Sequence, residues 1–116
     1  MESILPSIKK MLGIEDDYDH FDQDIITHIN STFNTLNQLG VGPEEGYIIS
    51  GDKESWEDFL GEFIRSLAMI KSYVYLKVRM LFDPPSSSIV ANAFNESIRE
   101  YESRINTQVE LMKKEG

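Results

Sequence analysis

Two consecutive prolines constrain the fold of this chain more than any other feature. A densely apolar helical pattern over Ile64–Phe82 ends at Asp83, Pro84 and Pro85 follow, and a second helical pattern restarts within Ser86–Ser88. Proline lacks the backbone N–H that a helix needs, and Pro84 also disfavours the helical conformation at Asp83. Serine oxygens accept hydrogen bonds from the first N–H groups of a helix. The sequence therefore predicts a rigid turn between two helices.

Apolar residues recur at helical spacing along most of the remaining chain. Pro6 fits the first turn of a short opening helix, which Gly13 ends, and Asp17 or Asp19 is expected to cap the second helix. Ser55 is expected to cap a helical turn, and Gly61 permits a kink after it. The predicted elements are helices over Ser3–Leu12, Asp19–Leu39, Glu62–Phe82 and Ser87–Lys113, with a helical turn over Ser55–Leu60.

The glycine-rich stretch after Leu39 interrupts the helical pattern and is expected to form an irregular loop. Within it, Tyr47–Ser50 has the β-branched and aromatic composition of a short strand. A lone strand leaves its backbone groups unpaired, so this one should pair in a small hairpin or with another copy of the chain. The predicted fold class is all-α, a bundle of about four helices with one irregular loop.

More apolar surface is present than a small bundle needs. Residues 66–82 are apolar or aromatic on nearly every side, which exceeds what two neighbouring helices cover. The last helix, at about 40 Å, should be longer than the others. We expect one domain over residues 1–116 with its core within about residues 1–100. Beyond Tyr101 the helix should project with an uncovered apolar stripe that binds a partner.

Composition excludes several classes of protein. The chain has 116 residues and no cysteine, which excludes disulfides, thiolate zinc sites and cysteine nucleophiles. No uncharged apolar run reaches the length of a membrane span, and the first residues do not resemble a signal peptide. We therefore expect a soluble intracellular protein that does not contact membranes.

Charge is distributed unevenly along the chain. Residues 1–62 carry 3 basic and 14 acidic residues, whereas residues 63–116 carry 8 basic and 6 acidic residues. A strongly negative surface repels the phosphates of DNA, and a direct grip on nucleic acid needs clustered lysine and arginine. The acidic half therefore predicts a surface that keeps DNA away or meets a basic protein.

Metal, cofactor and catalytic motifs are not expected. His20, Asp24 and His28 share one helical face, but two full turns separate the outer pair, so they do not readily converge on one ion. The aspartates of residues 16–24 lack the turn glycine of a calcium loop and are better explained by helix capping. The glycines of the central loop precede strand-like residues rather than a helix that would bind phosphate. We expect no enzyme activity.

Three segments of the chain resemble the head-tail connector, or adaptor, proteins of long-tailed bacteriophages. They are Ile70–Ser88, Ile8–Ile14 and Leu39–Pro43. The resemblance implies a small helical subunit of a ring, typically of twelve copies in the virion, beneath the portal protein. Such a ring extends the channel through which DNA passes without specific binding, and it joins the portal to a tail-side completion or stopper protein. It also implies a place in the neck of the virion, with assembly in the host cytoplasm.

Candidate interaction residues follow from the apolar and charge patterns together with the family resemblance. The end of the last helix is expected to bind the portal through Arg104, Ile105, Gln108, Val109 and Met112. Contacts within the ring are expected from Tyr47, Ile48, Ile49, Tyr73 and Tyr75. The surface facing the channel is expected to carry Glu15, Asp16, Asp17, Glu44, Glu45 and Asp52.

Two other functions remain open on sequence grounds. A small acidic regulatory protein that binds a basic partner or mimics DNA has the same charge, but it would be a monomer or dimer rather than a ring. A helix-turn-helix DNA binder is disfavoured, because no basic cluster opens the helix after Pro85.

Overall fold

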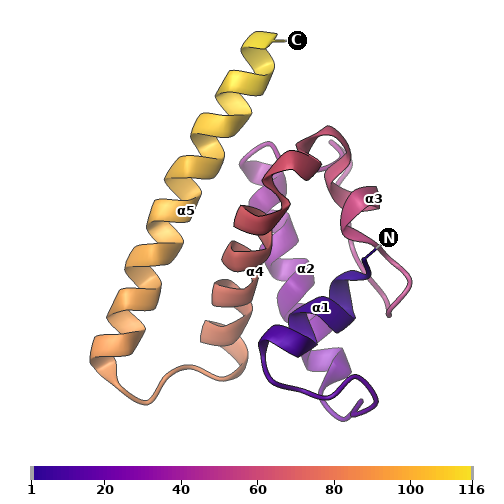
Figure 1. Cartoon of the computed structure of the whole chain (residues 1–116), viewed down its shortest axis with the longest axis vertical. Coiled ribbons are helices and arrows are strands. Elements are labelled where there is room, and N and C mark those ends of the chain that lie inside the picture. Colours follow the sequence, from indigo (N-terminus) through magenta and orange to yellow (C-terminus); the bar gives the residue numbers. More distant parts are fainter. Residues whose placement is uncertain (1, 116) are drawn as a thin grey trace.

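A computed structural model describes residues 2–115, without the side chain of Glu115, and these residues form an all-α fold. Figure 1 shows α4 in the centre, with α2 and α1 on one side and the long α5 on the other. The elements in chain order are α1 (Ile4–Met11), α2 (Asp22–Gln38), α3 (Trp56–Leu60), the 3-10 helix η1 (Gly61–Ser66), α4 (Leu67–Phe82) and α5 (Ser88–Glu115). The all-α prediction and the turn at the two prolines are confirmed.

Helix α4 occupies the centre because almost every side of it is apolar. It contacts α1, α2, η1 and α5, and its residues Ile70, Tyr73, Val74 and Val78 are buried. The sequence predicted that α4 has more apolar surface than its neighbours can cover. That prediction assumed that only two helices pack against α4. Three other helices pack on it instead, several of its apolar side chains stay partly exposed, and Leu81 at its C-terminal end is exposed.

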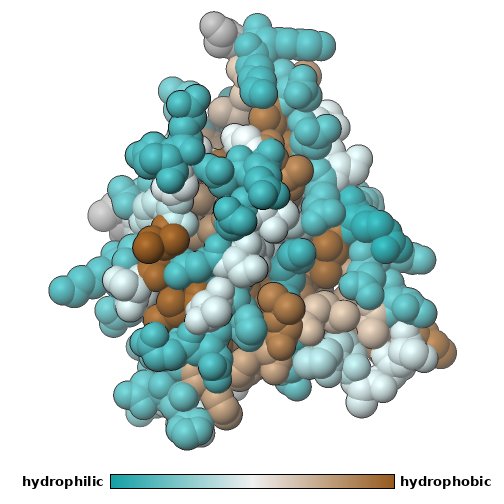
Figure 2. All heavy atoms as spheres, turned by 180° about the vertical axis from the view of Figure 1, so that it is seen from behind, coloured by the Kyte–Doolittle hydropathy of each residue, from teal (hydrophilic) through white to brown (hydrophobic). Residues whose placement is uncertain are grey.

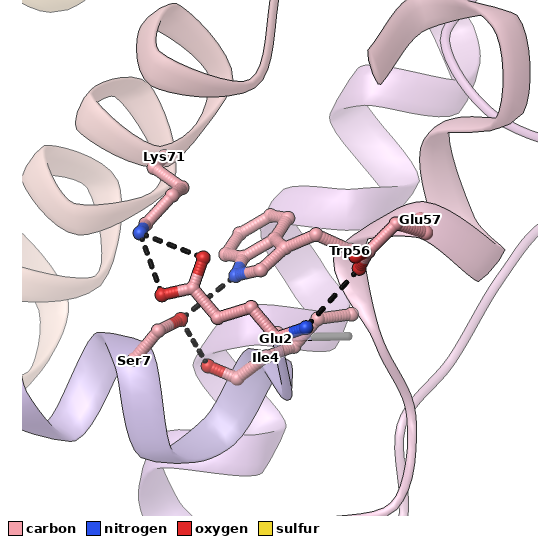
Figure 3. Close-up of polar contacts among 6 residues, drawn as sticks. All are labelled: Glu2, Ile4, Ser7, Trp56, Glu57 and Lys71. Carbon is pink, nitrogen blue, oxygen red and sulfur yellow. Dashed lines mark hydrogen bonds and ion pairs between the residues drawn. The ribbon is translucent and has the colours of Figure 1, made fainter.

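The segment before α1 is held by residues that follow much later in the chain. Ser3 and Ser55 form an isolated antiparallel bridge. The indole Nε1 of Trp56 donates a 2.8 Å hydrogen bond to Ser7 Oγ, and Lys71 Nζ pairs with the Glu2 carboxylate at 2.9 Å (Figure 3). Because Trp56 is fully buried, its N–H needs such a partner. These contacts fix α1 against α3 and α4.

The predicted strand at Tyr47–Ser50 is wrong. No strand is present among residues 2–115, and this segment is extended but irregular. The side chain of Asn30 on α2 takes the place of a neighbouring strand: its Oδ1 accepts from Ile49 N at 2.8 Å, and its Nδ2 donates to Ile49 O at 3.0 Å. One amide side chain thus satisfies both backbone groups of Ile49, so its pairing needs no hairpin and no second copy.

Two helix starts differ from prediction. Helix α2 begins at Asp22 with Phe21 at the N-cap position and no side-chain cap, so the expected cap by Asp17 or Asp19 is wrong. The helix predicted over Glu62–Phe82 begins instead as the 3-10 helix η1, whose first residue Gly61 has a φ of +54°. It becomes α-helical only at Leu67, where α4 begins. The predicted cap of α3 is confirmed, because Ser55 Oγ accepts from Asp58 N.

The expectation that α5 carries an uncovered stripe beyond Tyr101 is also wrong. Ile105 is fully buried and Val109 nearly so, and both belong to the hydrophobic core. Gly40, just after α2, permits this close packing, since a Cβ at Gly40 would lie 2.9 Å from Val109 Cγ1. The core therefore extends past residue 100, and only the last turns of α5 project beyond the bundle in Figure 1.

Candidate interaction surfaces

An acidic loop, defined here as residues 15–19, is organised by one buried lysine. Lys9 is 2% exposed, and its Nζ donates to Asp16 O at 3.0 Å and to Tyr18 O at 2.8 Å. Its third partner is Asp22 Oδ1 at 2.9 Å. The carboxylate and the two carbonyls offset the cost of burying the ammonium group. The loop is thereby attached through its main chain, and every side chain in it is exposed.

The six predicted channel carboxylates are all exposed, but they form two groups. Asp16 and Asp52 line the same shallow pocket beside Lys9, next to the acidic loop. Glu44 and Glu45 follow the C-terminal end of α2, where Asn37 Nδ2 donates to Pro43 O. The structure therefore does not bring these residues together on one continuous surface.

A basic groove, defined here by its eight lining residues, lies between the end of η1 with the start of α4 and the second half of α5. Its volume is about 550 Å³, and it is lined by Arg65, Ser66, Ala68, Met69, Ser103, Arg104, Thr107 and Gln108. Two arginines and no carboxylate occur in this lining. Arg104 forms an exposed ion pair with Glu100 one turn earlier, and such pairs contribute little to stability.

A second feature is an exposed apolar tip where α4 turns into α5. Ile89 is 80% exposed, and Leu81 and Val90 are also exposed. In Figure 2, some hydrophobic atoms reach the surface at this end of the molecule, beside residues of intermediate hydropathy. Val90 belongs to the apolar positions of α5 but lies at the surface.

The five predicted ring-contact residues have different surroundings. Tyr73 and Ile49 are in the core, so their side chains do not reach a neighbour in this conformation. Tyr47 is partly buried against Phe59 and its hydroxyl donates to Asp58 Oδ2 at 2.7 Å. Tyr75 is partly buried, and Ile48 is 72% exposed. Ile48 is thus the most available of the five.

The five predicted portal-binding residues lie in three different surroundings. Ile105 and Val109 are core residues, as described above. Arg104 and Gln108 are exposed and line the basic groove. Met112 packs partly against the core near the projecting end of α5. The interpretation of residues 104–112 as one partner-binding stripe therefore does not describe their arrangement.

Electrostatic surroundings alter the proton affinity of three side chains. Burial, followed by the hydrogen bond to Glu102, raises the pKa of Tyr73. Burial and then the bond to Asp58 raise the pKa of Tyr47 in the same way. Burial alone would raise the pKa of Glu54, but hydrogen bonds from the Ser50 amide and hydroxyl help to lower it overall. All three groups take part in local hydrogen bonds, and they do not converge on one site.

The three residues that share one helical face as potential metal ligands differ in exposure. His20 and Asp24 are exposed and His28 is partly buried, and within residues 2–115 no group of three potential ligands is placed to hold a metal ion. None of the described helices has the length and apolarity needed to cross a membrane.

Sequence reasoning missed Lys9 and the basic groove. Lys9 lies four residues after Leu5 on the buried face of α1, and a lysine within an apolar stripe was the available signal. The groove has no comparable signal, because Arg65 and Arg104 are brought together only by the packing of α4 against α5.

Comparison with known proteins gave one match. A family model described as phage connector protein matches residues 4–111. No curated protein and no solved structure matches the chain significantly.

Proposed function

The chain belongs to the phage connector protein family, whose members are structural virion proteins, and we propose that it forms a ring beneath the portal of a long-tailed phage. The family match over residues 4–111 carries this proposal. The proposed ring has twelve copies, lies in the neck of the virion after assembly in the host cytoplasm, and joins the portal to a tail-side stopper protein. Family membership favours this structural role over the acidic regulator.

The portal contact is assigned to the projecting end of α5. Leu111 is 49% exposed, Met112 is partly exposed, and the basic side chains of Lys113 and Lys114 follow. An apolar residue beside two cations fits a portal surface that is apolar with an acidic edge. Arg104 and Gln108 line the basic groove, for which a different partner is proposed below.

Ile48 is the predicted ring-contact residue with a freely exposed side chain, and the partly buried Tyr75 can contribute only its exposed edge. Glu44 and Glu45 are assigned to the channel, since both are exposed and negative side chains along a channel keep DNA solvated and mobile. Asp52 and the acidic loop lie at another part of the surface. DNA passes through the proposed ring without specific binding.

Reconstitution with the portal protein of the same phage tests the proposed function. The purified chain should sediment with portal particles, and electron microscopy should show an added ring on one end of the portal. A variant that ends after Glu110 should lose this binding while remaining folded by circular dichroism. A chain that never binds portal or virions, and instead binds a basic protein as a monomer or dimer, would contradict the proposal.

The channel assignment has a separate test. Changing Glu44 and Glu45 to lysine should leave folding nearly unchanged, because exposed charges contribute little to stability. The assembled ring should then bind DNA in a salt-sensitive manner, whereas the unchanged ring should not. Unaltered DNA binding by rings of this variant would place Glu44 and Glu45 outside the channel.

A further inference from the structure

We propose that the basic groove of one subunit binds the acidic loop of a second copy, and that this contact joins neighbouring subunits head to tail. The inference rests on the ring proposed above and names its subunit contact. It begins from the chemistry of the groove. Arg65 is exposed and has no ion pair with any of residues 2–114, so its charge is free to bind a carboxylate from outside.

The rest of the groove also suits a polypeptide with acidic side chains. Arg104 pairs only with Glu100 on the same helix, with both partners more than half exposed, and such a pair is easily exchanged for a better one. Guanidinium groups bind carboxylates through two parallel hydrogen bonds. The apolar side chains of Ala68 and Met69, with nearby hydroxyls, complete the lining.

The acidic loop has the complementary composition. Glu15, Asp16, Asp17 and Asp19 surround Tyr18, which is 49% exposed. Tyrosine and arginine are the residues that most often dominate binding at protein interfaces. A tyrosine ring can also stack on a guanidinium group and contact a methionine thioether. The loop therefore offers both the charge and the aromatic group that the basic groove can bind.

Lys9 makes the acidic loop well suited to association. Because Lys9 binds two main-chain carbonyls of the loop, the backbone is already held before any partner arrives. Less conformational freedom is then lost on binding. The exposed carboxylates are free to pair with a neighbour.

The two complementary surfaces lie at opposite ends of a molecule whose longest extent is 42 Å. Figure 1 shows the start of α4 and the second half of α5 toward the top and the α1–α2 connection at the bottom. Each copy thus offers one groove and one loop, so the contact can repeat from copy to copy. A repeated head-to-tail contact closes into a ring when its rotation permits.

Glu44 and Glu45 fit the groove less well as a partner. They follow the end of α2, where Gly40 lies against Val109 of α5, and this is the end of the molecule that holds the groove. The acidic loop is the negative segment at the opposite end. An acidic segment of the portal protein is the other candidate occupant of the groove. Portal binding by the charge-reversed variants distinguishes it from the acidic loop.

Cysteine cross-linking tests the contact directly, because the natural chain contains no cysteine. A Glu15→Cys/Thr107→Cys variant places one thiol in the acidic loop and one at the groove. Under mild oxidation at high concentration, it should form a ladder of covalent dimers, trimers and larger species. Each single variant should stop at dimers. A matched Glu45→Cys/Thr107→Cys variant should give no ladder.

Charge reversal provides an independent measurement. Arg65→Glu/Arg104→Glu should weaken self-association by at least about tenfold, and so should Glu15→Arg/Asp17→Arg. Combining all four changes should restore association, because the groove is then negative and the loop is then positive. Arg99→Glu/Lys53→Glu carries the same charge change at two exposed positions outside the groove and should have little effect. Circular dichroism spectra like that of the unchanged protein exclude misfolding as the cause.

The outcomes distinguish this inference from the proposed function. Oligomers that form without the ladder, or that tolerate both charge reversals, overturn the contact but leave the ring. A ladder from the Glu45→Cys control would assign the groove to the other acidic segment. A chain that stays monomeric and gives no ladder overturns the contact, and loss of portal binding by Arg65→Glu/Arg104→Glu would then identify the portal as the occupant.

Discussion

The Tyr73 hydroxyl donates a 2.7 Å hydrogen bond to Glu102 Oε2, and this bond joins α4 to α5. Tyr73 is fully buried, so its hydroxyl requires a partner, and the carboxylate is a strong acceptor. The bond fixes how far α5 is shifted along α4. Because the basic groove lies between the same two helices, this alignment also sets which side chains line it.

Tyr73→Phe should lower the free energy of unfolding by about 1–2 kcal/mol, since a buried hydrogen bond to a charged acceptor is lost. Urea denaturation at neutral pH measures this loss. Tyr18→Phe, in the exposed acidic loop, is the matched control and should change stability by less than about 0.5 kcal/mol. The folded-state pKa of Tyr73 is raised, so its contribution is present below the unfolded pKa and declines as pH rises above about 10.

Gly40→Ala should destabilise the fold more than Gly46→Ala. Both glycines have positive φ, +97° and +95°, so each alanine has a similar backbone cost of about 1–2 kcal/mol. Only at Gly40 would the added Cβ meet Val109, whereas nothing lies within 4 Å at Gly46. The extra crowding should cost about 1–3 kcal/mol. Thermal unfolding of the two variants measures the difference. Equal losses of stability would show that α5 shifts to accommodate the added Cβ.

Shortening α5 should have very different effects at two positions. Ending the chain after Glu110 removes Leu111 to Lys114, which are exposed or only partly buried, together with the last two residues, and the domain should stay folded. Ending it after Ser103 also removes Ile105 and Val109 from the core, and losing a buried aliphatic side chain typically costs about 2–5 kcal/mol. The second truncation should therefore unfold at a much lower temperature, if it folds at all. A stable domain ending at Ser103 would mean that α5 is an accessory helix.

Asn30→Ala should release the segment around Ile49. Both backbone groups of Ile49 bond to the Asn30 side chain, so hydrogen exchange at the Ile49 amide should become faster. Asn30→Asp keeps an acceptor for Ile49 N but places a carboxylate oxygen against Ile49 O, and it should also be destabilising. Asn34→Ala, one turn later on the exposed face of α2, is the control. Unchanged exchange in Asn30→Ala would mean that burial of Ile49 alone holds the segment.

The helices were predictable because their signals are local. Apolar spacing located α1, α2, α4 and α5, the prolines located the turn, and Ser55 began α3 as expected. The failure at Tyr47–Ser50 has a physical reason, because β propensity records side-chain shape and not the partner that satisfies the backbone. That partner is a single amide on α2, 19 positions earlier in the chain than Ile49.

The interaction surfaces were less predictable, since they depend on how helices pack. The stripe on α5 correctly identified apolar positions, but whether Val109 is covered depends on the missing side chain at Gly40. Tyr73 was expected at a subunit contact and instead bonds to Glu102 in the core. Residues 65 and 104 are far apart in the sequence, and only the tertiary structure makes them neighbours in one groove.

The attachment of α1 has a consequence for synthesis on the ribosome. Its partners Trp56 and Lys71 lie 49 and 69 positions after Ser7 and Glu2. Chains emerge from their N-terminal side at about 5–20 residues per second, so α1 leaves the ribosome several seconds before its partners on α3 and α4, although α2 follows it directly. During that interval only α2 is available to cover the apolar face of α1, so the native docking of this early helix is completed only when α3 and α4 have followed.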